Sequence, residues 1–409
     1  MKLYFTIAWR NIWRHKRRTL IVVLSIAMSL AMMMIYDGLM VGFNDAIYAN
    51  AVKILGGNVQ VHADGYRMKN GNKPLLPLKD DQSVLEAARS LPNVTVATRR
   101  INTGGIVTNR TGAFSVTITG IEPEMEHTVS LVSANIAAGR DLTANDQDMI
   151  LIGQGLASAM DAGVGDRITM AGSDVHNKTV QRTMTIAGIY DVGLPEIEKR
   201  TIYISLNEAG YLFGLDGQST EVVLFLEQLG QESQVIKGLE RSVSGYEVDP
   251  WEKNFPEMSA TIERKNGVMD VFGVIILSIA GIGILNMLLM AVFERTREIG
   301  VLGALGIKPR QIGWMFILEG AMMGVVGLVA GVALGLLINS IFAKVGFDYS
   351  EFANMTEYTA LIKGRVYSTL GLEKIWQRVV TVLVIAVLSS LYPARTAALK
   401  EPAAALHTV

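Results

Sequence analysis

The sequence of 409 residues has no cysteine and only five histidines. The lack of cysteine excludes disulfides, thiolate metal sites and a cysteine nucleophile. The histidines form no HxxxH or HExxH pair, so no zinc or other metal site within one stretch of sequence is expected. The sequence also has no GxxxxGKS or GxxxxGKT loop, and without it the backbone cannot cradle a nucleoside triphosphate. We therefore expect no catalytic residues and no ATP hydrolysis by this chain alone.

Charge is scarce and almost balanced. The chain has 37 basic and 38 acidic residues, a net charge of −1, which excludes a strongly basic nucleic-acid-binding protein. Charged residues make up 18% of the chain, below the level of about 25% in soluble proteins. Half of the residues are hydrophobic and the mean hydropathy is +0.32. This composition favours a membrane protein with a sizeable soluble part.

Four stretches are long and apolar enough, or nearly so, to cross a bilayer, which takes about 20 residues in a helix. They are residues 20–40, 271–293, 320–342 and 376–394. The fourth is the weakest, because Arg378 and Pro393 lie near its two ends. We interpret the first as an uncleaved anchor, since its apolar run exceeds the roughly 7–15 residues of a signal-peptide core.

Basic residues beside these spans predict their orientation, because Lys and Arg gather on the cytoplasmic side. Six precede the first span, four lie between the second and third, and two follow the fourth. We therefore expect both termini to be cytoplasmic and the long insert after the first span to be extracytoplasmic. The expected fold is an α-helical membrane protein with four transmembrane helices in a 1+3 layout.

The insert at residues 41–270 reads as a folded α+β domain between transmembrane helices 1 and 2. Short runs of period-two alternation predict strands, and helical patterns lie between them. The predicted strands are 58–62, 114–119, 149–152, 167–170, 183–186, 200–204 and 221–226. We expect two lobes, one from the early and late parts of the insert and one from about 115–225. Helical patterns at 37–54 and 258–270 predict helical stalk ends.

Several segments then carry a family resemblance. They are AWRNIWRHKRRT at 8–19, ERTREIGVLGALGI at 294–307, EGAMMGVVGLVAG at 319–331 and YPARTAALKEPAAAL at 392–406. Together they resemble ABC-transporter permeases of the MacB/FtsX/LolC–LolE family. The run LGGNVQVHADGY at 55–66 is most similar to the lipoprotein-release (LolC/LolE) type.

The resemblance implies a permease subunit in a bacterial inner membrane, driven by a separate ABC ATPase present in two copies. ATP-Mg would bind to that ATPase, and no cofactor to this chain. A second permease chain, identical or homologous, would complete the transporter. It would act by mechanotransmission, extracting lipoproteins or lipids from the outer face of the membrane. Two alternatives stay open: MacB-like export of peptides or macrolides with a periplasmic adaptor, and FtsX-like regulation of a cell-wall hydrolase without transport.

The remaining segments complete the predicted order. Residues 1–19 form a cytoplasmic amphipathic helix, 294–319 a cytoplasmic coupling loop or helix, 343–375 an extracytoplasmic loop and 395–409 a cytoplasmic tail. In the coupling loop the resemblance implies contact with the ATPase by Glu294, Arg295, Thr296, Arg297, Glu298 and Gly300. The alternative is a plain solvated connector. We expect Glu319, near the bilayer, to pair with a basic residue of this loop, since an unpaired acid there is costly.

A lipid or substrate cavity between the first two spans is a further hypothesis. Methionine adapts to irregular apolar shapes, and the first span is rich in it. The candidate residues are Met33, Met40, Phe43, Met269 and Phe272. The alternative is that these side chains only pack against other helices or face lipid.

Overall fold

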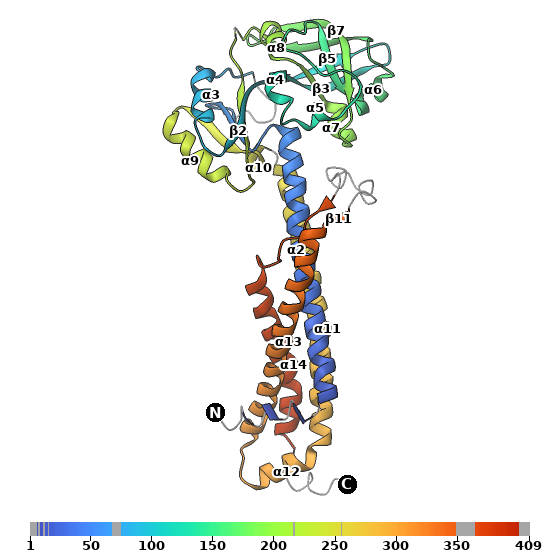
Figure 1. Ribbon diagram of the computed structural model, residues 1–409, viewed down its shortest axis with the longest axis vertical. Helices are drawn as coiled ribbons and strands as arrows, with labels where there is room; N and C mark the ends of the chain where they lie inside the picture. Colours follow the sequence, from blue (N-terminus) through green and yellow to red (C-terminus); the bar gives the residue numbers. More distant parts are fainter. Residues whose placement is uncertain are drawn as a thin grey trace. The chain divides into compact units, whose positions relative to one another are not determined.

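The computed structural model describes most of the chain, with gaps near both termini and in two loops. The described residues are 6, 9–10, 13–14, 16–67, 75–215, 217–254, 256–348 and 365–400. The chain divides into two compact units (Figure 1). The helical unit comprises Met1–Asn44, Thr261–Asp348 and Arg365–Val409, and the sheet unit comprises Asp45–Ala260 and Tyr349–Gly364. Each unit is described separately below.

The helical unit is built on four long helices. They are α2 (Lys16–Leu55), α11 (Pro256–Glu294), α13 (Pro309–Val345) and α14 (Ile375–Ala398). In the described part of the chain, four helices are long and apolar enough to cross a membrane. Their apolar segments are Thr19–Ile54, Asp270–Glu294, Pro309–Val345 and Ile375–Ala398. The four predicted spans each fall on one of these helices.

Glycines of α13 allow neighbouring helices to approach closely. A Cβ at Gly331 would lie 3.0 Å from the Ala27 carbonyl oxygen of α2, and one at Gly324 would lie 2.8 Å from the Ala386 Cβ of α14. Small residues at such spacings favour tight helix packing in lipid. The glycines of the third span therefore pack α13 against both α2 and α14.

In the described residues of the sheet unit, ten strands form one sheet. They are β1 (Val59–Ala63), β2 (Val94–Thr108), β3 (Ala113–Ile121), β4 (Ile136–Gly139), β5 (Met149–Gly153), β6 (Arg167–Ser173), β7 (Thr179–Tyr190), β8 (Thr201–Ser205), β9 (Glu221–Leu226) and β10 (Tyr246–Pro250). Their order is β10-β1-β9-β2-β3-β8-β5-β7-β4, and β6 pairs with both β2 and β7. Six strands, from β2 through β3, β8, β5, β7 and β6, thus return to β2. The sequence predicted strands here but not this barrel-like closure.

Two hydrophobic cores divide the sheet unit into lobes. The barrel-like strands enclose one core, which includes Ile118, Ile150 and Phe213. The second core lies where α3 (Asp81–Arg89) and α9 (Glu232–Ser242) contribute buried residues beside β1, β9 and β10. The long strand β2 belongs to both lobes, because its first half pairs with β9 and its second half with β6. One lobe thus combines the early and late parts of the region, and the other contains its middle.

Short helices connect the strands, and one more, α10, follows the last strand of the sheet. They are α4 (Pro123–Glu126), α5 (Leu131–Ala134), α6 (Gln154–Met160), α7 (Pro195–Arg200), α8 (Leu206–Phe213) and α10 (Trp251–Asn254). Helix α8 has a defined start, since the Ser205 hydroxyl accepts the Glu208 N–H, and a left-handed Gly214 ends it. These are favoured residues at helix ends.

Candidate functional site

The loop after α11 forms a short helix, α12 (Thr296–Ala304). The Thr296 hydroxyl donates to the carbonyl oxygens of Val292 and Phe293, both at 3.0 Å, and so satisfies acceptors at the end of α11. On α12, Ile299 is buried in the core of the helical unit. The opposite face of α12 is therefore presented outward while its inner face is fixed.

An ion-pair chain links α12 to two other segments. Glu298 accepts a hydrogen bond from Arg295 at 2.8 Å and another from Arg14 at 3.2 Å. Arg295 also lies 3.8 Å from the buried carboxylate of Glu319 on α13. The hydrogen bond from Arg295 holds the pKa of Glu298 below its usual value. The expectation that Glu319 pairs with a basic residue of the loop is confirmed, and that residue is Arg295.

The six predicted coupling residues lie together at the end of α11 and the start of α12. Glu294, Arg297 and Glu298 are exposed. The other three are at least partly buried: Arg295 forms the ion pairs, Thr296 bonds the end of α11, and Gly300 is packed. Their contact with an ATPase stays a prediction.

Two apolar residues, Val301 of α12 and Leu305 directly after this helix, were missed by sequence reasoning. Val301 and Leu305 are exposed, Leu305 to 75%. They are four residues apart, a spacing that places side chains on one face of a helix. Their sequence signal was this spacing. The outer face of α12 therefore combines charge of both signs with an apolar contact.

A second cluster joins three helices through buried charge. Arg378 of α14 donates to both carboxylate oxygens of Asp37 on α2, at 2.9 and 2.8 Å, and to Asp270 on α11 at 2.8 Å. Lys374 bonds both oxygens of Asp270 at 2.9 Å. The side chains of Arg378 and Asp37 are 3% and 4% exposed, whereas that of Asp270 is 34% exposed. Two cations and two anions balance here, so each buried charge is compensated.

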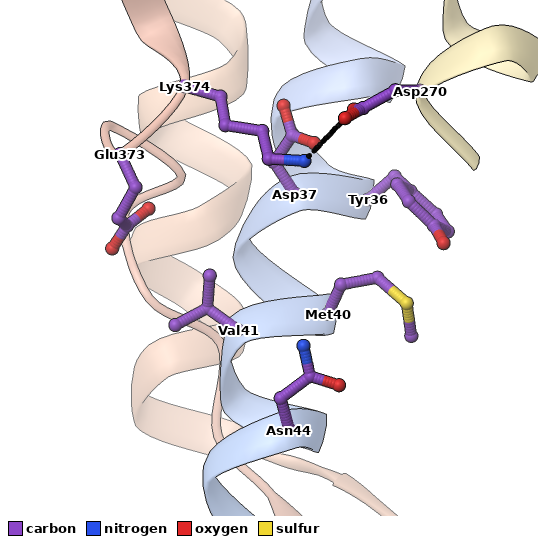
Figure 2. Close-up of a pocket in the computed structure, with 8 residues that line it drawn as sticks. All are labelled: Tyr36, Asp37, Met40, Val41, Asn44, Asp270, Glu373 and Lys374. Carbon is purple, nitrogen blue, oxygen red and sulfur yellow. Dashed lines mark hydrogen bonds and ion pairs between the residues drawn. The ribbon is translucent and has the colours of Figure 1, made fainter. Parts of the chain in front are cut away.

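A small cavity of about 90 Å³ borders this cluster. Figure 2 shows Lys374 facing Asp270, and the side chains that come from α2 are Tyr36, Asp37, Met40, Val41 and Asn44. The lining residues are Tyr36, Asp37, Met40, Val41, Asn44, Asp270, Glu373 and Lys374. Four of the eight lining side chains are charged, so the cavity suits water better than an acyl chain.

The structure separates the residues predicted to form a substrate cavity. Met33 is buried and meets Gly273 of α11, and Phe43 is also buried. Phe272 is 54% exposed, and Met40 lines the small cavity instead. The side chain of Met269 lies outside the described residues. Of the described members, Met40 alone lines the small cavity beside the charged cluster, and the role of the set in substrate binding stays a prediction.

Sequence reasoning also missed the charged cluster. Its signal was present, because Asp37, Asp270 and Arg378 each lie at or near an end of an apolar span, where charge is costly. Their pairing could not be predicted, since Asp37 and Arg378 are 341 positions apart.

A family model described as a MacB-like periplasmic core domain matches residues 19–240, more than half of the chain. A second model, the FtsX-like permease C-terminal domain, matches residues 271–402. The chain therefore belongs to the MacB/FtsX/LolC family of ABC-transporter permeases.

Individual relatives agree with this assignment. The chain is 24% identical over 404 residues to "Lipoprotein-releasing system transmembrane protein LolC" of Neisseria meningitidis, covering 95% of this chain and 94% of that protein. It is also 24% identical over 344 residues to LolC of Xylella fastidiosa, covering 81% and 82%. "Macrolide export ATP-binding/permease protein MacB" of Agrobacterium fabrum is 24% identical over 350 residues, with 83% of this chain and 53% of that protein covered.

A solved structure, the periplasmic region of MacB from Actinobacillus actinomycetemcomitans, is similar to 53% of this chain and 97% of its own. Its TM-score is 0.35 and its identity is 11%. The sequence relatives and the four apolar helices together indicate an inner-membrane protein that works with an ABC ATPase.

Proposed function

We propose that this chain is the permease subunit of an ATP-driven transporter that acts by mechanotransmission. Its substrate would be a lipoprotein or lipid taken from the outer face of the inner membrane, as the name of its LolC relatives implies for them. The observation that carries the mechanism is the largely buried ion pair between Arg295, at the start of α12, and Glu319 of α13, 3.8 Å apart. It gives a force applied to α12 a direct route to α13.

The proposed topology has one span before the α+β outer domain and three after it, with both termini cytoplasmic. Basic residues next to the first span support it, as does the position of exposed tryptophans. Trp314 lies near the start of α13 and Trp376 near the start of α14, and both are exposed. Tryptophan is enriched at the two membrane interfaces.

The outer face of α12 would be the docking surface for the ATPase. Val301 and Leu305 would enter an apolar groove, while Glu294, Arg297 and Glu298 would contact charged groups at its rim. Interfaces with an apolar centre and a polar rim are typical of protein docking. Two ATPase copies, each binding ATP-Mg, would face two permease chains, and this chain would bind no cofactor itself.

At the other end of the spans, the charged cluster would set which helix moves. The Arg378–Asp37 pair is buried, so separating it would expose two charges to a low dielectric, which is costly. The bonds to Asp270 are partly exposed, and exposed ion pairs contribute little stability. We propose that α11 separates from α14 here while α2 stays attached. Movement of α11 away from Met33 and Met40 would then make room for an acyl chain.

The test of this function is release of a lipoprotein from proteoliposomes that contain the complete transporter. Glu298→Lys should lower release per ATP hydrolysed at least about fivefold, the lower range of energetic coupling between sites. The matched control is Glu227→Lys, a charge reversal at an exposed acid of the sheet unit. Normal release per ATP by Glu298→Lys would contradict the proposed coupling.

Export of a macrolide or peptide is a second candidate, favoured by the match of residues 19–240 to the MacB-like core domain. Mass spectrometry of proteins retained with the full chain in mild detergent separates the two. A lipid-modified protein with the ATPase supports extraction, whereas a periplasmic adaptor with the ATPase supports export.

A further inference from the structure

Helix α11 has one buried face and one exposed face within the helical unit. Leu277, Ile284 and Leu288 of the buried face belong to the core of this unit. On the exposed face, residues recur at alternating steps of three and four, which is the spacing of the a and d positions of a heptad repeat. These residues are Phe272, Ile275, Ile279, Ile282, Asn286 and Leu289. The first four are 50% to 63% exposed, so the described part of the chain leaves much of this repeat uncovered.

Asn286 is the one polar side chain of the repeat. It is exposed, and its amide has no hydrogen-bond partner among the described residues. It lies inside the apolar segment Asp270–Glu294, about 12 Å along the helix from Glu294. The hydrocarbon core is about 30 Å thick, and lipid tails offer an amide neither a donor nor an acceptor. An exposed amide at this depth is therefore costly unless another protein chain bonds it.

Other polar groups of the apolar helices are satisfied within this chain. Asn339 of α13 is buried, and its amide donates to the carbonyl oxygens of Met34 at 2.9 Å and Leu370 at 3.1 Å. Ser278 of α11 is exposed, but its hydroxyl donates to the Val274 carbonyl oxygen of its own helix at 2.7 Å. Asn286 thus differs from a buried amide and from an exposed hydroxyl of the same unit.

The identity of the partner follows from the chemistry of the amide. An asparagine side chain both donates and accepts hydrogen bonds, so two copies of it are complementary to each other. All copies of a membrane protein insert in the same orientation, and α11 of one copy therefore runs parallel to α11 of another. In a parallel pair related by a two-fold axis, equivalent a positions face each other. A single asparagine at an a position favours one register of such a pair.

We propose that the exposed face of α11 binds α11 of a second copy of this chain, with the two Asn286 amides hydrogen-bonded to each other. The apolar positions of the repeat would pack on both sides of this bond, in a left-handed supercoil. An acyl chain would cover the same apolar positions but would leave the amide without a partner. The proposal rests on the proposed function only for the presence of a second permease chain, and it specifies that this chain is identical.

The test is oxidative cross-linking in native membranes, without added nucleotide, of two differently tagged copies of the full chain. The chain has no cysteine, so Ile279→Cys introduces a single thiol at an a position and keeps Asn286. A disulfide needs two Cα atoms about 4.4–6.8 Å apart, which only helices in direct contact provide. We expect a cross-linked dimer that carries both tags. The matched control is Val274→Cys, which is 45% exposed on another side of α11 and should link much more slowly.

A second measurement tests the amide itself. Full chains labelled at Leu370→Cys, an exposed position outside the repeat, are diluted in liposomes, and energy transfer between the labels gives the dissociation constant of the dimer. Asn286→Leu keeps the apolar volume and should raise this constant at least about threefold, the factor that corresponds to an average hydrogen bond between membrane helices. Asn286→Gln keeps an amide and should raise it less. Ser278→Ala, the control, should leave it unchanged.

Three results would overturn the proposal. They are a cross-link from Ile279→Cys no faster than that from Val274→Cys, a cross-link to a different protein in place of the second tag, and an unchanged dissociation constant in Asn286→Leu. The cross-link should also persist in Glu298→Lys, the variant expected to lose coupling to the ATPase. A dimer that forms while release fails would contradict the proposed function alone, and release without this contact would contradict only the dimer surface.

Discussion

Replacing Arg378 tests the charged cluster of the helical unit most severely. Arg378→Gln leaves Asp37 buried without its cation, because the two side chains are 3% and 4% exposed and joined by two hydrogen bonds. Removing one partner of a buried ion pair costs about 3–5 kcal/mol. Asp270 loses less, because it keeps its two bonds to Lys374.

Lys374→Met is the comparison within the same cluster. The side chains of Lys374 and Asp270 are 37% and 34% exposed. Ion pairs at such exposure contribute about 0–1 kcal/mol to the free energy of unfolding. The double variant Asp37→Asn with Arg378→Gln removes both buried charges and should recover part of the loss. Their coupling energy then follows from the double-mutant cycle.

The assay is unfolding of the purified chain in mixed micelles, with the free energy of unfolding measured for each variant. Arg378→Gln should lower the free energy of unfolding severalfold more than Lys374→Met does. Only the loss caused by Lys374→Met should become smaller at high salt, because salt screens exposed ion pairs. Equal losses below about 1 kcal/mol for both would refute the view that the Arg378–Asp37 pair holds α2 and α14 together.

Two further predictions concern the packing of the helical unit and the acid stability of the sheet unit. Gly331→Leu should cost about 1–3 kcal/mol of unfolding free energy, because its Cβ would lie 3.0 Å from Leu30 Cβ on α2; Gly283→Leu, with open space at its position, should cost little. Burial raises the pKa of Glu221, but the hydrogen bond from His62 and nearby positive charge outweigh this and lower it. Its ionised form thus stabilises the fold at neutral pH, and this contribution is lost as the pH falls through the lowered pKa. Glu221→Gln should therefore speed hydrogen exchange in β9 near pH 7 and have a smaller effect near pH 3; an equal effect at both would contradict this.

Local patterns were sufficient for the four apolar spans and for seven of the ten strands of the sheet, but not for β2, β4 and β10, nor for the partners of any element. The four spans follow from the length of apolar runs, and Glu319 could be assigned a basic partner because a lone acid near lipid is costly. The closure of the barrel-like sheet depends on β6 pairing with β2, about 60 positions apart, which no periodicity reports. Periodicity indicates which face of a helix or strand is buried, but not which other element packs against that face.

The predicted substrate cavity shows the same limit. Methionine-rich composition indicated adaptable apolar surface, but it could not show that Met33 is covered by Gly273 of α11. The charged cluster depends on Asp37, Asp270 and Arg378 from three separate helices. In the sequence, each of these residues is a single charge at or near the end of an apolar span. Only their arrangement in space shows that their charges compensate one another.

A site-specific cross-link can show whether α12 docks on an ABC ATPase. The chain has no cysteine, so a single Leu305→Cys carries one benzophenone probe at the exposed apolar position that directly follows α12. We expect an ATPase cross-link in native membranes, with a yield that changes when ATP is added. Leu370→Cys, exposed before α14, should give none. If Leu305→Cys gave no ATPase cross-link, or Leu370→Cys gave an equal one, docking of the ATPase at α12 would be wrong.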